Sequence, residues 1–217
     1  MSTMGIREAI NKIKDNVLKE IQVVKGEKGK DKIYFSKNEY KSLGEAKEAF
    51  VRSRSKLFDV NQWSKMPGFS STFELFHANG SRKLTSNVEI GDYMLINLPG
   101  PVPENWVKVT SLISQENLAE FVVSPSAQPI GKMENGEKIE HFFSEEASST
   151  FRIKRTGKTL SAYEIGRDES INNEGKQAAD REWINTLIAE GAWLGFQKIQ
   201  WKNLTDYLVH HTEIKRS

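Results

Sequence analysis

The chain has 217 residues, and its 31 basic and 29 acidic side chains give a net charge of +2. This balance gives no overall attraction to nucleic acid or to an anionic membrane, and the length suits one large domain or one domain with extensions. Cysteine is absent, which excludes disulfides, thiolate metal sites and cysteine catalysis. The start is too polar for a secretory signal, and no apolar run approaches the roughly 18 residues of a membrane span. We therefore expect a cytoplasmic protein that binds neither membranes nor nucleic acid.

The first segment carries apolar residues at every third or fourth position, which predicts an amphipathic helix of about five turns. This stripe consists of Ile6, Ile10, Ile13, Val17, Ile21 and Val24. The charged, glycine-containing stretch KGEKGKDK follows and is typical of a linker. We expect residues 1–30 to form a helix and linker whose stripe packs on the rest of the protein, on a partner helix or in a homo-oligomer.

Residues 32–36 predict a short strand, and a helix is expected from about Asn38 to Phe58 with Asn38 as its N-cap. The pair Pro67-Gly68 then ends the helical region, and Trp63 is expected to anchor the turn from below. From Ser71 onward the pattern changes to alternating strands.

Strands are predicted at 71–77, 93–98, 106–113 and 118–124, with a further short strand at 139–143. Short or proline-marked turns join the three successive strands at 93–98, 106–113 and 118–124, which favours an antiparallel meander. The clearest local pattern is the β-hairpin of residues 148–167. Phe151 and Ile153 alternate with basic residues there, and Gly157 supplies the turn because glycine accepts a positive φ.

The remainder of the chain is predicted to be helical. Gly191 and Gly195 are expected to break or kink the helix, and Trp201, Leu204 and Leu208 predict a second helix beyond them. That helix is expected to fold back over the sheet or to offer an apolar face to another subunit. The expected organisation is an N-terminal helix and linker (1–30), a main α+β domain (31–195) and a C-terminal helix (196–217).

The order of elements is that of an α+β protein: a strand, a helical stretch, a run of antiparallel strands and a C-terminal helix. Over about Lys32 to Ala192 this order resembles the helix-grip fold of START-like proteins. The resemblance implies a curved antiparallel sheet wrapped around a long C-terminal helix, with a cavity between them that often takes apolar ligands. A small, partly open barrel built on the meander is a second possible architecture.

One group of residues indicates catalysis. His141 lies in the sequence EHFFSEE near Glu145 and Glu146, and a histidine beside carboxylates can bind a metal or act as a base. Arg167 follows the last strand and could bind a polar group. These four residues are the candidates for a hydrolase-like or metal-assisted enzyme. No metal-binding spacing such as H-E-x-x-H is present, so we expect no metal and no cofactor. The terminal pair His210-His211 is expected to be solvated.

The leading hypothesis is a non-enzymatic protein that binds an apolar small molecule or a protein partner. The residues expected to line a ligand cavity are Phe73, Leu75, Met94, Ile96 and Tyr163. A cavity of several hundred Å³ would favour a small molecule, and a filled core would favour a protein partner. Trp193 and Trp201 are the tryptophans expected at an interface, and the terminal helices are the expected contacts of a homo-oligomer.

Overall fold

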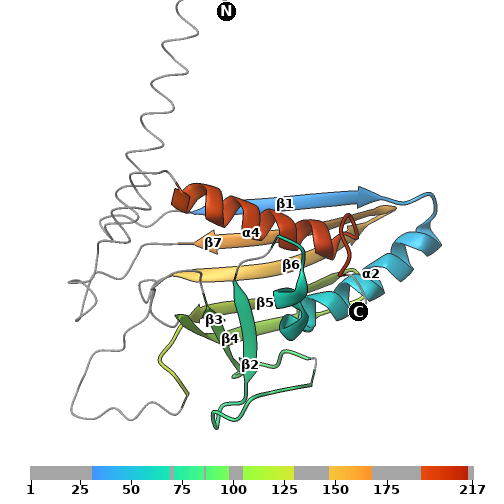
Figure 1. Cartoon of the computed structure of the whole chain (residues 1–217). Helices are drawn as coiled ribbons and strands as arrows, with labels where there is room; N and C mark the ends of the chain where they lie inside the picture. Colours follow the sequence, from blue (N-terminus) through green and yellow to red (C-terminus); the bar gives the residue numbers. More distant parts are fainter. Residues whose placement is uncertain are drawn as a thin grey trace, which may run out of the picture.

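The computed structural model describes residues 31–68, 71–85, 87–97, 105–129, 147–167 and 192–214, with the side chains of α4 described from residue 200 onward. Its strands form one antiparallel sheet of seven strands in the order β1-β7-β6-β5-β4-β3-β2 (Figure 1). The strands are β1 (Lys32–Glu39), β2 (Thr72–Phe76), β3 (Tyr93–Asn97), β4 (Asn105–Ser114), β5 (Leu118–Pro125), β6 (Ser148–Thr156) and β7 (Thr159–Arg167).

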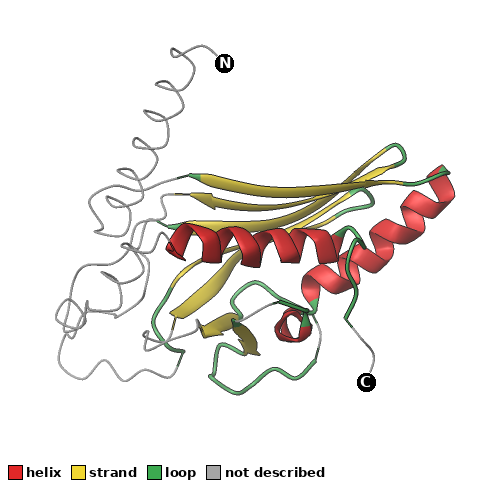
Figure 2. Ribbon diagram, turned by 45° about the horizontal axis from the view of Figure 1, so that its top comes forward, coloured by secondary structure: helices red, strands yellow, loops and turns green. Residues whose placement is uncertain are grey.

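The described helices are α2 (Leu43–Phe58), the 3-10 helix η1 (Val60–Lys65) and α4 (Ala192–Leu208). They lie against one face of the curved, open sheet, whose edge strands are β1 and β2 (Figure 2). The predicted α+β class with a curved antiparallel sheet is therefore confirmed. None of the described helices has both the length and the apolar character needed to cross a membrane.

The β6–β7 hairpin forms as its sequence predicts. The two strands pair along their whole length, from Ser148 opposite Arg167 to Thr156 opposite Thr159. Gly157 occupies the turn with φ of +59°, in the left-handed region that favours glycine. The strand at 139–143 lies outside the described residues.

Helix α2 begins later than predicted, and Asn38 is not its N-cap. Residues 37–39 extend β1 because they pair with β7, and the Asn38 amide donates to the carbonyl of Val209 at 2.9 Å. Ser42 caps the helix instead: its hydroxyl accepts from the Glu45 backbone amide at 3.1 Å, while the Glu45 carboxylate accepts from the Lys41 amide at 3.1 Å. Ser42 and Glu45 have the spacing of a capping box, so the cap was readable in the sequence.

Helix α4 continues through Gly195, so the helix is not broken at that residue, and Gly191 lies outside the described residues. Leu204 and Leu208 are fully buried and belong to the same core cluster as the sheet residues. The C-terminal helix therefore folds back over the sheet. Burial of its apolar side outweighs the roughly 1 kcal/mol that glycine costs inside a helix.

The centre of the core is filled by aromatic rings. Trp63, fully buried in η1, lies 5.6 Å from Phe73, 6.0 Å from Phe121 and 5.1 Å from Phe151 between ring centroids. Its indole N–H donates to the carbonyl of Lys56 at 3.0 Å. Trp63 therefore anchors the turn after α2, as predicted, and joins η1 to β2, β5 and β6.

Candidate functional site

Four of the five residues predicted to line a ligand site lie together on the core face of the sheet. Phe73 pairs with Ile96 and Leu75 pairs with Met94 across β2 and β3, and all four are at most 6% exposed. Tyr163 lies on the opposite face of β7, where its ring stacks on the exposed ring of Phe35 at 5.5 Å. The five residues therefore do not share one surface.

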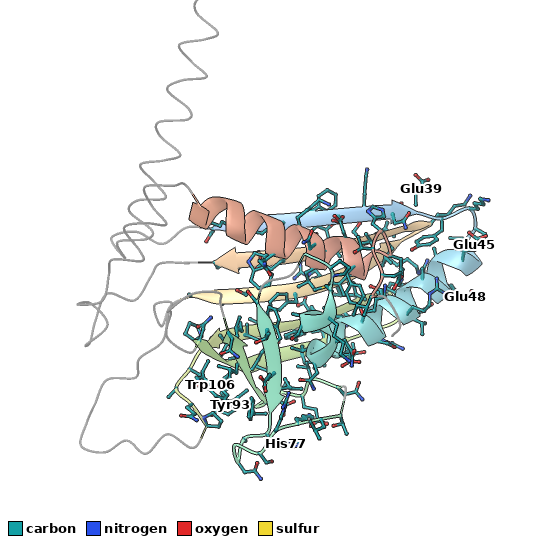
Figure 3. The ribbon with its side chains drawn as sticks, in the orientation of Figure 1. Glu39, Glu45, Glu48, His77, Tyr93 and Trp106 are labelled. Carbon is teal, nitrogen blue, oxygen red and sulfur yellow. The ribbon has the colours of Figure 1, made fainter. Side chains whose placement is uncertain are left out.

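The residues predicted for catalysis are not brought together in the described structure. His141, Glu145 and Glu146 lie outside the described residues, and Arg167 is exposed at the end of β7. Within the described ranges, no three histidine, aspartate or glutamate side chains are grouped as a metal site. Figure 3 shows Glu39, Glu45 and Glu48 at the junction of β1 and α2, at the opposite end of the sheet from Tyr93 and Trp106.

A buried polar group lies beside the predicted apolar lining. Asn105, the first residue of β4, pairs with Ile96 and is 2% exposed. Among the described residues its side-chain oxygen Oδ1 has no hydrogen-bond partner. A buried acceptor left without a donor costs about 1–3 kcal/mol, so this oxygen requires an explanation.

Trp201 of α4 packs on the aromatic cluster at the helix-facing side of the sheet. Its ring lies 6.3 Å from Phe73 and 5.6 Å from Phe151, and the residue is only partly buried. We call the set Phe73, Ile96, Asn105 and Trp201 the inner end: the first three lie side by side on β2, β3 and β4, and Trp201 of α4 contacts Phe73. The inner end combines apolar rings with one hydrogen-bond acceptor.

Two further polar residues are buried on the helix-facing side of the sheet. Glu164 of β7 is 0% exposed and pairs with Tyr34 of β1, and Gln200 of α4 is 3% exposed. A carboxylate is costly to remove from water, so buried acidic residues are uncommon without a specific role. Neither residue stood out in the sequence, where Glu164 is one polar position of an alternating strand.

A polar cluster that joins β1 to α4 was also not predicted. The Ser36 hydroxyl donates to Oδ1 of Asp206 at 2.6 Å, and Lys202 Nζ donates to the same hydroxyl at 3.1 Å. Burial raises the pKa of Asp206, but hydrogen bonds from Lys202 and Ser36 outweigh it and hold that pKa below its usual value. Ser36 and Asp206 are 170 positions apart, so no local pattern connects them.

His210 is not solvated, contrary to the expectation for the terminal pair. Its Nε2 lies 3.0 Å from the carbonyl oxygen of Ala49, and its Nδ1 lies 2.8 Å from Nζ of Lys56. Burial lowers the pKa of His210. His211 is exposed, and its Nδ1 lies 3.4 Å from Asp206. The contacts of His210 join the C-terminal segment to α2.

The strand order and the helices on one face agree with the resemblance to helix-grip proteins. Comparisons with known proteins show a similar fold and no significant similarity in sequence. No family model matches the chain, and no curated protein matches it in sequence. A hypothetical protein of Helicobacter pylori, jhp0584, has a TM-score of 0.50 and 11% identity over 86% of this chain and 92% of that one. At that identity the match shows a shared fold and nothing further.

Structures of helix-grip proteins are among the more distant matches. Ginseng major latex-like protein 151 of Panax ginseng has a TM-score of 0.42 and 12% identity, covering 85% of this chain and 99% of that one. Norcoclaurine synthase of Thalictrum flavum has a TM-score of 0.38 and 12% identity, covering 87% and 92%. Likenesses at this level indicate nothing about what the present chain binds.

Proposed function

We propose that this is a non-enzymatic binding protein that takes a small, mainly apolar molecule with a hydrogen-bond donor at the inner end. One observation carries the proposal: Oδ1 of Asn105 is a buried acceptor with no hydrogen-bond partner among the described residues. A ligand N–H or O–H directed at this oxygen would remove the cost of leaving it unsatisfied.

The surroundings of Asn105 suit an apolar ligand body. Ile96 lies opposite Asn105 in the sheet, Phe73 lies opposite Ile96, and the Trp201 ring is adjacent to Phe73. Binding sites for small molecules are typically apolar with a few polar groups that fix orientation. The inner end has that composition on three strands and one helix.

The packing of the core restricts where such a ligand could lie. The rings of Trp63, Phe121 and Phe151 fill the centre, with centroids 5.1 to 6.0 Å apart. A ligand in the middle of the domain would have to displace them. The inner end lies beside this filled centre, and the ring of its Trp201 is only partly buried.

The first experiment is native mass spectrometry of the gently purified full chain. We expect a bound small molecule on the wild type and its loss from Asn105→Leu, which keeps the side-chain size but removes the acceptor. Ser53→Ala is the matched control, because Ser53 is also fully buried and its hydroxyl also lacks a hydrogen-bond partner among the described residues, but it lies on α2. The control should retain the bound molecule.

A second experiment uses two aromatic probes of similar shape. Indole has one N–H donor and benzothiophene has none. We expect indole to bind the wild type more tightly than benzothiophene, and roughly tenfold more tightly than it binds Asn105→Leu, since one hydrogen bond contributes about 1 kcal/mol or more. Indole affinity that is the same in both proteins would contradict the proposal, as would the same bound mass on Asn105→Leu.

A further inference from the structure

The face of the sheet that points away from the helices carries an apolar patch at its β1 edge. Ile33 and Phe35 are large apolar residues of β1 and are 66% and 46% exposed. Ile33 pairs with Ile165 of β7, and Phe35 pairs with Tyr163, on which its ring stacks. We call these four residues the outer patch.

The outer patch continues inward across the sheet. Ile165 pairs with Thr150 of β6, which pairs with Val122 of β5, so one row of apolar or methyl-bearing side chains spans four strands. The neighbouring row ends at Arg152 and Glu120, which form an ion pair. Isolated exposed apolar residues are ordinary, but a contiguous patch of this kind marks a contact surface. The described residues leave Ile33 and Phe35 largely exposed.

We infer that the apolar stripe of residues 6–24 docks on the outer patch of the same chain. The segment is joined directly to the patch, because β1 begins at Lys32 and Ile33 is its second residue. This contact would lie on the opposite side of the sheet from the inner end, so the inference stands apart from the proposed ligand.

The dimensions of the segment fit this position. As a helix, residues 6–24 would be about 28 Å long, and the eight residues of β1 extend about 26 Å. Residues 25–31 can reach at most about 24 Å, enough for the chain to reverse direction and lie along the strand. Gly26 and Gly29 lie in this connection and ease the reversal.

The chemistry of the two surfaces also matches. Every member of the stripe is isoleucine or valine, and the outer patch offers two isoleucines and two aromatic rings. A tethered segment meets its site at an effective concentration in the millimolar range, so a modest apolar contact is sufficient for docking. A second copy of the chain has no such advantage in dilute solution.

Because the chain contains no cysteine, paired cysteine substitutions report this contact directly. The test pair is Ile13→Cys with Phe35→Cys, and a second pair is Val17→Cys with Ile33→Cys. The control pair is Ile13→Cys with Val51→Cys, since Val51 is 51% exposed on α2. All three folded-domain positions are exposed, so the substitutions should leave the fold intact, which thermal unfolding checks.

Mild oxidation of each full-length variant at low concentration is followed by intact mass. We expect disulfide formation within one chain to be at least about tenfold faster for one of the test pairs than for the control pair, whose N-terminal cysteine and connecting residues 14–31 are the same as in the first test pair. Equal rates for test and control pairs would overturn the inference. Disulfides formed only between chains would also overturn it, and would assign the outer patch to a second copy.

Discussion

Lys56 donates a hydrogen bond to His210, with Nζ of Lys56 2.8 Å from Nδ1 of the imidazole. An ammonium group can only donate, so Nδ1 is the unprotonated nitrogen and Nε2 carries the hydrogen that it donates to the carbonyl of Ala49. This assignment is the neutral form of the imidazole, which burial favours by lowering the pKa of His210, although Nδ1 also lies 3.3 Å from Oε1 of Glu213. The same ammonium donates to Glu213 at 2.8 Å and to the carbonyl of Tyr207 at 3.0 Å, so one lysine connects α2 to three residues near the C-terminus.

This arrangement predicts loss of stability in mild acid. Burial lowers the pKa of His210 and the charge of Lys56 lowers it further, against the opposing effects of Ala49 and Glu213. The unfolded chain, with a histidine pKa of about 6.5, then binds more protons than the folded chain, so the free energy of unfolding decreases as the pH falls below that value. The pKa values of Glu213 and Asp206 are also lowered in the folded protein. Protonation of these two carboxylates therefore reduces the free energy of unfolding further, but only at more acidic pH.

The measurement is the urea midpoint at pH about 7.5 and about 5.5. His210→Asn should reduce the difference between the two, and asparagine suits the site because His210 has φ of +66°. His77→Asn is the control, since His77 is exposed, and it should leave the difference unchanged. A wild-type midpoint that does not move between these two pH values would contradict the neutral state of His210.

A second prediction concerns Lys83, whose side chain is almost fully buried. Its Nζ donates to Asp92 at 2.7 Å and to Glu89 at 2.8 Å, and Asp92 is only 5% exposed. Lys83→Met should lower the free energy of unfolding by about 3 kcal/mol, because it leaves the Asp92 carboxylate buried without its cation.

The matched control is Arg82→Ala, which removes an exposed ion pair with Glu74 and should cost less than about 1 kcal/mol. Adding Asp92→Asn to Lys83→Met should recover part of the loss, since the uncompensated charge is gone. The free energy of unfolding is measured with urea. An equal decrease for Lys83→Met and Arg82→Ala would show that the buried ion pair does not stabilise the fold as predicted.

A third prediction tests the aromatic core. Trp63 contacts the rings of Phe73, Phe121 and Phe151 and is 0% exposed. Trp63→Ala should cost about 3–5 kcal/mol, since the cavity left behind cannot close fully. Leu84→Ala should change stability by less than about 0.5 kcal/mol, because Leu84 is 79% exposed. Chemical unfolding of both variants is the measurement, and a loss below about 1 kcal/mol for Trp63→Ala would contradict the described packing.

A fourth prediction separates backbone strain from crowding at the β6–β7 turn. Gly157 has φ of +59°, and a Cβ placed there would meet nothing within 4 Å. Gly157→Asn should therefore cost little, since asparagine adopts this conformation readily, whereas Gly157→Val should cost about 1–2 kcal/mol. The measurement is thermal unfolding of the two variants. Similar melting temperatures for both would indicate that backbone strain at this residue is unimportant.

Local patterns in the sequence were sufficient to predict the central part of each described strand and the hairpin. Alternation of Phe151 and Ile153 with basic residues identified β6, and Gly157 identified its turn, because strand periodicity and turn conformation depend on residues close together in the chain. Four of the predicted lining residues lie on one face for the same reason. Tyr163 lies on the other face, and alternation alone shows that two faces exist but not which one meets the helices.

The tertiary structure decided the features that depend on distant segments. Residues 37–39 are strand rather than helix because β7 pairs with them, and α4 continues through Gly195 because the sheet buries its apolar side. The pKa of His210 is lowered because the fold buries the side chain and places Lys56, 154 positions away in the chain, beside it. In the sequence, nothing distinguishes Asn105 from other polar residues. Only the pairing of β4 with β3 encloses its side chain among apolar residues, where an unsatisfied oxygen becomes costly.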